Sequence, residues 1–191
     1  MDFSHYSDVP VQIAVDLVNT LDAVSGEEKL ASPHDVTEFI RSRDTDWCKP
    51  GWSATPSDLD DVIALRFRLR MIFDAADESA AADTINCVLS EAGAVPRLSL
   101  HGEGPHLHFE SDDDRPARWL GAVTAMGLTV ALIEGGFERF GTCMSSSCDD
   151  VFVDGSRNRS RRHCSDTCTS RENVAAHRAR QRNAAASSDA K

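Results

Sequence analysis

This sequence lacks the short motifs that identify the commonest classes of enzyme. It has no glycine-rich phosphate-binding loop, no helical histidine pair at metalloprotease spacing and no nucleophile elbow. Its longest apolar stretches are interrupted by charged residues, and its N-terminus lacks the basic and apolar segments of a signal peptide. We therefore expect a cytoplasmic protein that does not span a membrane and is not an enzyme.

Aromatic residues are also scarce, at 6% of the chain, but apolar residues make up 41% of the 191 positions. That content suits one domain of ordinary size with a core of its own, followed by a small module. The net charge of −11 is unevenly distributed. Residues 155–191 hold nine basic and three acidic residues, a net +6, whereas residues 1–154 hold eleven and twenty-eight, a net −17. Only the C-terminal segment is therefore suited to a polyanionic partner.

Cysteine is concentrated in this C-terminal region. Cys143 and Cys148 enclose four residues, Cys164 and Cys168 enclose three, and fifteen residues separate the two pairs. Two close pairs are typical of a zinc site in which four thiolates occupy the corners of a tetrahedron. Because such a site has no open position for water or substrate, we predict one structural Zn²⁺. The remaining cysteines are expected to be free thiols of a reducing compartment: Cys48 and Cys87.

The residues around the second pair predict what the metal holds together. Val151 to Asp154 is a β-prone run, and residues 158–163 are expected to return as a second strand after a Gly-Ser turn. Ser165 or Asp166 can then cap a helix that runs to about Arg182. A knuckle formed by Cys143 to Cys148, a hairpin and a helix form a treble-clef-like zinc finger. So short a unit depends on its metal for much of its folding free energy.

Arginine supplies almost all the positive charge of this segment. Guanidinium groups bind phosphate oxygens in pairs, which favours a nucleic-acid surface; the alternative is a solvated helix face or a disordered tail. We expect the arginines before the second cysteine pair to contact phosphates, and those of the helix to reach base edges if it enters the major groove. The candidate DNA-binding residues are Arg157, Arg159, Arg161, Arg162, Arg171, Arg178, Arg180 and Arg182.

These residues resemble the CGNR zinc finger over roughly 141–182. The resemblance is carried by the cysteine spacing and by the run Val-Phe-Val-Asp-x-Ser-Arg-Asn-Arg-Ser-Arg-Arg, which ends at Arg162. The tetrapeptide that names the family reads Cys-Thr-Ser-Arg here, from Cys168 to Arg171. The segment from Ile13 to Thr20 in turn resembles the start of ABATE domains, which precede the finger in this family. The resemblance implies a stress-induced bacterial transcription regulator whose N-terminal domain senses a signal.

The rest of the N-terminal region reads as mainly helical. Apolar periodicity and capping signals predict helices over about 10–22, 32–43, 57–76 and 80–92, and a long helix from about 116 that ends near either 135–136 or 140–141. Alternating residues at 97–101 and 106–110 predict a β-hairpin whose inward face is Leu98, Leu100, Leu107 and Phe109. The opposite face would collect histidines, which are either a solvated face or, less expectedly, a metal or ligand site: His101, His106 and His108.

Two polar residues of the first predicted helix are candidates for ligand binding. Asp16 and Asn19 stand one turn apart, so both side chains could line one pocket. The alternative is that they anchor a neighbouring loop through hydrogen bonds.

These patterns together predict a mainly α protein of the α+β type. We expect an ABATE-like sensor domain over 1–140, a CGNR-type zinc finger over 141–183 and a disordered tail over 184–191. The expected partners are double-stranded DNA, a small-molecule effector and, because many bacterial regulators read two half-sites, a second copy in a homodimer. The alternative function is a zinc-stabilised module that binds protein or RNA without sequence-specific DNA binding.

Overall fold

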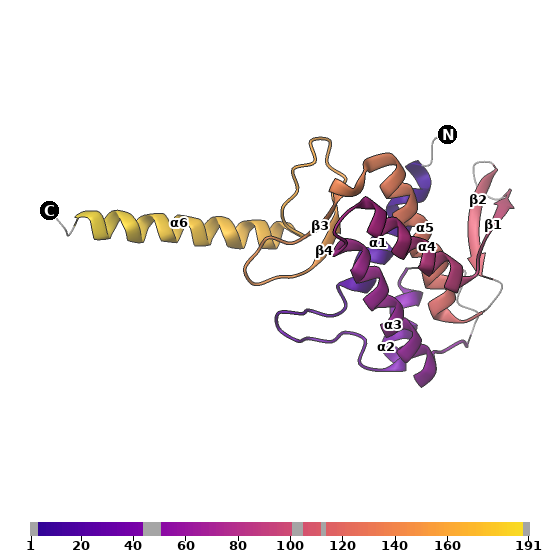
Figure 1. Cartoon of the computed structure of the whole chain (residues 1–191). Helices are drawn as coiled ribbons and strands as arrows, with labels where there is room; N and C mark the ends of the chain where they lie inside the picture. The colour runs from indigo at the N-terminus through magenta and orange to yellow at the C-terminus, as the bar shows by residue number, and fades with distance from the viewer. Residues whose placement is uncertain (1–3, 44–50, 101–104, 112–113, 189–191) are drawn as a thin grey trace.

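A computed structural model describes residues 4–43, 51–100, 105–111 and 114–188 of the chain (Figure 1). The described part is mainly helical with two small antiparallel sheets, which confirms the predicted fold class. The helices are α1 (Ser4–Val18), α2 (Pro33–Arg41), α3 (Pro56–Phe73), α4 (Glu78–Ala92), α5 (Pro116–Gly135) and α6 (Asp166–Ser188). The strands are β1 (Ala94–Ser99), β2 (His106–Ser111), β3 (Phe140–Thr142) and β4 (Val151–Val153), with a 3-10 turn η1 at Phe137–Arg139.

Helix α5 lies at the centre of the helical body and packs against α1, α3 and α4. Leu120 and Leu128 on this helix are fully buried. The helix approaches α1 closely at Gly127, where an added Cβ would lie 2.6 Å from the Cβ of Pro10. A residue without a side chain is required there, because any other would push the two helices apart.

Among the described residues, α5 is also the one helix long and apolar enough to cross a membrane by length and composition alone. Its most apolar 18-residue window is 56% buried inside the protein, against the neighbouring helices. The apolar character of α5 is therefore accounted for by its place in the core.

Local sequence signals predicted most of the observed helix ends to within a few residues. Ser32 caps α2 by accepting from the Asp35 N–H, and Gly93, at φ +63°, ends α4 in a left-handed conformation. Helix α3 begins earlier than expected, because Thr55 and Asp58 form a reciprocal capping box. Helix α1 starts at Ser4 and ends before Asn19, whose side chain is engaged elsewhere.

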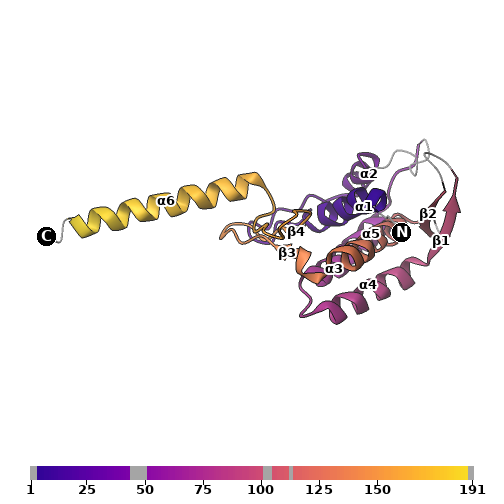
Figure 2. The same cartoon turned by 90° about the horizontal axis from the view of Figure 1, so that it is seen from above.

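The predicted β1–β2 hairpin forms, with Leu98 opposite Leu107, but the prediction that its leucines face inward is wrong. Leu98 is 68% exposed, Leu100 75% and Leu107 39%. The hairpin lies at the end of the body furthest from α6 (Figures 1 and 2), where it contacts α5 and α4 but leaves these leucines exposed. His101 lies outside the described residues, as do the side chains of His106 and His108, so a role for these histidines stays a prediction.

The second sheet differs from the expected one. Strand β4 pairs with β3, which precedes the first cysteine pair, and Phe140 lies opposite Val153. The predicted partner of β4, residues 158–163, forms turns and coil instead, because the buried carboxylate of Asp154 holds that loop in a folded shape by accepting from the backbone N–H groups of Ser156 and Arg161.

The new pairing joins the finger to the helical body. Phe140 and Val151 belong to the same hydrophobic core as α1, α3 and α5, and the rings of Phe73 and Phe140 lie 5.6 Å apart. The finger is therefore packed on the body and is not tethered by a linker.

Helix α6 projects away from the rest of the protein in both views (Figures 1 and 2). It continues to Ser188, beyond the predicted end at Arg182, through three consecutive alanines of high helix propensity. Of the tail predicted to be disordered, 184–188 are thus helical, and 189–191 lie outside the described residues.

Candidate metal centre

The four predicted cysteine ligands come together at the base of α6. The sulfur atoms of Cys143, Cys148, Cys164 and Cys168 all lie within 4.8 Å of one another. The Cys148 and Cys164 sulfurs are 3.6 Å apart, and those of Cys164 and Cys168 3.7 Å. Zinc–sulfur bonds of about 2.3 Å at tetrahedral angles place sulfurs about 3.8 Å apart. The cluster therefore fits one structural Zn²⁺ ion.

Each ligand is positioned by local backbone structure. Cys143 follows β3 and donates its N–H to Asp150 O over 2.8 Å, which closes the knuckle around Cys148. Cys164 precedes α6, and Cys168 lies in its first turn, where the Cys168 N–H donates to Ser165 Oγ. One ligand pair thus comes from a turn between strands and the other from a helix N-terminus.

The pKa values of the four clustered thiols are shifted in opposite directions. Burial raises the pKa of Cys148 to about 12, and burial likewise raises the pKa of Cys164. The pKa of Cys143 is lowered although burial opposes this, because the backbone N–H groups of Cys164 and Ser145 hydrogen-bond to its sulfur. Four thiolates in one small space repel one another, and a divalent cation removes that repulsion when it binds.

Two side chains of α6 hold this helix against the knuckle, and sequence reasoning assigned neither this role. The Glu172 carboxylate accepts from Ser145 Oγ at 2.8 Å and from the Ser146 N–H at 3.1 Å. The hydrogen bond from Ser145 is the main reason that the pKa of Glu172 is lowered. Arg171 donates to Ser147 Oγ over 2.8 Å. The orientation of α6 is therefore fixed by these contacts as well as by Cys168.

The loop between β4 and the second cysteine pair is shaped by a buried acid that sequence reasoning also missed. Asp154 is 3% exposed, and Arg139 donates to both the Asp154 and the Ser156 carbonyl oxygens. Burial opposes ionisation, yet the pKa of Asp154 is lowered by the hydrogen bonds from Ser156 and from the Arg161 N–H. The only available signal was an aspartate at the end of a predicted strand, which is common in turns.

The eight candidate arginines divide into two groups. Arg161 stacks 4.9 Å from the Phe152 ring centroid and donates to His163 O, and Arg159 pairs with Glu138. Arg161, Arg159 and the knuckle-bound Arg171 therefore make contacts within the protein. The other five side chains are exposed and make no hydrogen bond or ion pair within the described ranges: Arg157, Arg162, Arg178, Arg180 and Arg182.

Two residues of the helical body clamp the finger. The Asn19 side-chain amide donates to Val151 O over 3.0 Å, and its oxygen accepts from Val151 N–H over 2.8 Å, as a neighbouring strand would. Arg70 on α3 donates to the Asp149 carbonyl over 2.8 Å and pairs with the Asp149 carboxylate at 2.9 Å. Both contacts lie beside the first cysteine pair.

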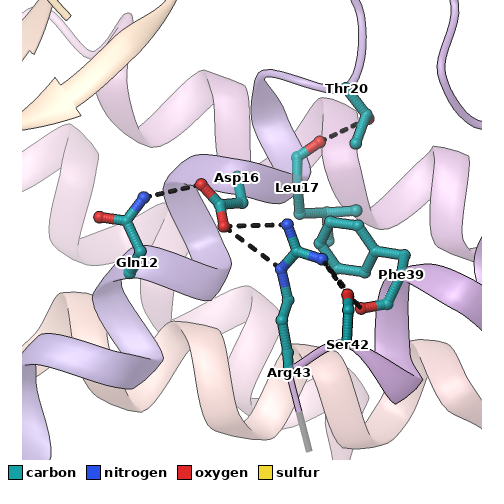
Figure 3. Close-up of polar contacts among 7 residues, drawn as sticks. All are labelled: Gln12, Asp16, Leu17, Thr20, Phe39, Ser42 and Arg43. Atoms are coloured by element: carbon teal, nitrogen blue, oxygen red, sulfur yellow. Dashed lines mark hydrogen bonds and ion pairs between the residues drawn. The ribbon is translucent and has the colours of Figure 1, made fainter. Parts of the chain in front are cut away.

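Asp16, the other predicted ligand-binding residue, joins α1 to the end of α2 (Figure 3). Its carboxylate accepts from the Gln12 amide at 2.7 Å and pairs with Arg43 at 2.9 Å, and the Arg43 guanidinium lies 3.8 Å from the Phe39 ring centroid. The hydrogen bonds of Asp16 and Asn19 are those expected of anchoring residues. A ligand-binding role for either stays a prediction.

Two family models match successive parts of the chain. A family model named ABATE, with the description "Putative stress-induced transcription regulator", matches residues 12–136, more than half of the chain. A second model, the CGNR zinc finger, matches residues 139–181 and includes all four clustered cysteines. No curated protein matches the chain. The chain therefore belongs to the ABATE family and carries a CGNR zinc finger behind the ABATE domain.

Proposed function

We propose that this protein is a zinc-dependent, DNA-binding transcription regulator of the cytoplasm. The main support is that helix α6 projects from the zinc centre, away from the acidic helical body, and carries exposed arginines. Arg178, Arg180 and Arg182 lie on the projecting part of α6, where the described structure offers no carboxylate to pair with them. A polyanion supplies the charge that these side chains lack, and the net −17 of residues 1–154 confines its contacts to the finger.

The proposal gives the ABATE domain the role of sensing a small molecule or a stress signal. Support comes from the way the finger is mounted, because Asn19 and Arg70 tie the helical body to the segment that carries the first zinc ligands. A change of packing in the body would therefore alter the hydrogen bonds that position β4. A homodimer with two fingers on two half-sites belongs to the same proposal. No catalysis is assigned, because four thiolate ligands leave zinc without an open position.

Duplex binding of the full-length zinc protein tests the proposal. If the five exposed arginines each contact a phosphate, the logarithm of the affinity should fall with the logarithm of salt concentration with a slope of roughly −4.5. Selection from random duplex DNA should then enrich one sequence motif. Changing Arg178, Arg180 and Arg182 together to Gln should abolish most of this binding, whereas Arg41→Gln, an exposed arginine on α2, should leave it unchanged.

A protein- or RNA-interaction module is the second candidate, because exposed guanidinium groups also suit acidic peptides and RNA phosphates. The same measurement distinguishes the two functions. Full zinc occupancy with no affinity for duplex DNA, together with binding of an RNA hairpin or an acidic peptide, would favour the interaction module.

A further inference from the structure

The pattern of buried residues along α6 shows which side of the helix faces the rest of the finger. From Asp166 to Arg182, only Cys168, Glu172 and Ala179 are buried or partly buried. These residues follow one another at spacings of four and seven, so they lie along one line of the helix. Cys168 points to the metal cluster and Glu172 to the knuckle, so this line is the face turned towards the finger.

The opposite side of α6 carries a line of uncharged, exposed side chains. At about 100° per residue, the positions half a turn away from the inner line are Ser170, Val174, His177 and Gln181. All four are exposed, and Val174 is 48% exposed although it is apolar. These four residues are called the outer stripe. It offers a hydroxyl, two methyl groups, an imidazole and an amide.

Arginines border the outer stripe on both sides. Arg178 and Arg182 are one turn apart and lie on one edge, on the same line as Arg171, whereas Arg180 lies on the other edge. Residues 173–188 contain no Asp or Glu, so Arg178, Arg180 and Arg182 have no acidic neighbour within one turn before or after them in the helix; the acidic residues of α6, Asp166 and Glu172, lie nearer its start. Arg178 and Arg182 therefore repel each other across one turn unless phosphates lie beside them.

A groove of the zinc finger lies on the same edge of α6 as Arg180. An open groove of about 830 Å³ lies between the 154–163 loop and the first turns of α6, and its lining includes Arg161, Arg162 and Asn173 together with the acidic Asp154 and Asp166. Asn173 is seven residues before Arg180, hence on the same edge of the helix. A nucleic-acid backbone that follows this edge would pass the guanidinium groups of Arg162 and Arg180.

This arrangement matches the major groove of duplex DNA. That groove is about 12 Å wide, is walled by the phosphates of two strands and displays base edges on its floor, and an α-helix with its side chains is about 10–12 Å across. We infer that α6 lies in the major groove with the outer stripe on the base edges. Val174, His177 and Gln181 then read the sequence, while the arginines on both edges contact phosphates of the two strands.

The inference rests on the proposed function and reverses the expectation that the helix arginines reach base edges. The residue chemistry is consistent with the new assignment. A side-chain amide such as that of Gln181 forms two hydrogen bonds with adenine, and the methyl groups of Val174 can pack on a thymine methyl. Guanidinium groups match the paired oxygens of a phosphate.

Two kinds of variant of the full-length zinc protein test the inference, using duplexes that carry the motif selected by the wild type. His177→Ala and Gln181→Ala should each lower affinity for the motif by roughly 5- to 150-fold and relax the preference at one or two adjacent positions. Their salt dependence and their binding to unrelated duplexes should stay the same. Arg180→Gln and Arg182→Gln should instead weaken binding to every duplex alike and reduce the salt slope by about 0.9 each.

Arg41→Gln is the charge-matched control, and circular dichroism checks that α6 persists in the alanine variants, which have higher helix propensity than the residues they replace. An unchanged motif in both alanine variants, or a changed motif in Arg182→Gln, would overturn the inference while DNA binding stands. Tighter binding of duplex RNA than of DNA would overturn it too, because the major groove of A-form RNA is too narrow for side chains to read. Absence of binding to any duplex would remove the proposed function and the inference together.

Discussion

The helical body and the zinc finger are stabilised in opposite ways. In the body, side chains such as Leu69, Leu120 and Leu128 are completely removed from water, and the hydrophobic effect supplies most of the stabilisation. The finger buries few apolar groups, and its loops depend on the metal cluster and on single polar residues such as Asp154 and Glu172. One chain therefore pairs a region stabilised by burial with one whose order depends on a bound ion.

The two regions meet at a small contact with mixed character. Phe140 and Val151 enter the core of the body, while Asn19 and Arg70 reach from the body to the backbone of the finger. The finger can therefore lose its order while most of the body keeps its own.

Removal of zinc should have the largest effect and should be confined mainly to the finger. Structural zinc sites contribute about 10–16 kcal/mol of binding free energy, which a Cys164→Ser variant or a strong chelator would remove. We expect hydrogen exchange of 143–182 to become fast, while α5 remains protected. The melting temperature of the body should fall moderately, because Phe140 and Val151 lose their fixed positions.

Cys87→Ser provides the matched control, since this exposed thiol on α4 lies outside the metal cluster. It should change neither zinc stoichiometry nor exchange. If chelation exposed α5 to exchange as fast as α6, the two regions would form one cooperative unit, and the comparison would fail.

The strongest polar contact of the body should give the next largest effect. Arg66 is 3% exposed, and its guanidinium donates to both oxygens of Glu28 at 2.7 Å and to Thr20 Oγ at 3.0 Å. Glu28→Gln leaves a buried cation without its counter-charge, which should cost about 3–5 kcal/mol in denaturant unfolding. Glu38→Gln, which breaks an exposed pair with Arg41, should cost less than about 1 kcal/mol.

The same ion pair predicts a pH dependence. The hydrogen bonds from Arg66 hold the pKa of Glu28 below its ordinary value of 4.5. A carboxyl group with a lowered pKa in the folded state stabilises the fold fully above its ordinary pKa, and this stabilisation is lost as the pH falls through the lower, folded value. Unfolding measured from pH 7 down to pH 3 should therefore show a smaller acid loss in Glu28→Gln. Equal slopes for both proteins would contradict this role.

A cavity in the centre of the body should cost a similar or slightly smaller amount. Leu128→Ala removes a fully buried side chain of α5 and should lower the free energy of unfolding by about 2–5 kcal/mol. Ile133→Ala on the same helix truncates a side chain that is 76% exposed, so it should change the free energy of unfolding by less than about 0.5 kcal/mol. Both variants should keep full zinc occupancy, and loss of zinc from Leu128→Ala would show that the finger depends on the core more than its contacts suggest.

Features that depend on local sequence were predictable. The cysteine spacing, the Ser32 cap and the terminal Gly93 are each read from neighbouring residues, and zinc and most helix positions followed from them. The exposed Leu98 was not predictable in the same way. Alternation identifies the two faces of a hairpin, but which face is covered depends on how far the neighbouring helices extend.

Contacts between distant parts of the chain could not be predicted from the sequence, for a different reason. A strand of three residues such as β4 has no side-chain pattern long enough to select its partner, so the choice of β3 depends on the fold. The role of Asn19 depends on a residue 132 positions away. Sequence reasoning could propose that its amide anchors a loop, but it could not identify the loop.

Asn19 therefore gives the smallest and most specific test of how the two regions are joined. Asn19→Ala leaves the Val151 N–H and C=O without their partners, which should cost about 1–3 kcal/mol. Hydrogen exchange at Val151–Val153 should accelerate in this variant while zinc stays bound. Removing zinc with a chelator should lower the melting temperature of the body less in the variant than in the wild type. Asn19→Asp keeps the acceptor for Val151 N–H and loses the donor, so its effect should be intermediate. Gln12→Ala, on the same helix, should leave β4 unchanged. If β4 exchanged equally slowly in Asn19→Ala, the packing of Phe140 and Val151 alone would hold the finger to the body, and Asn19 would have no part in transmitting a signal between them.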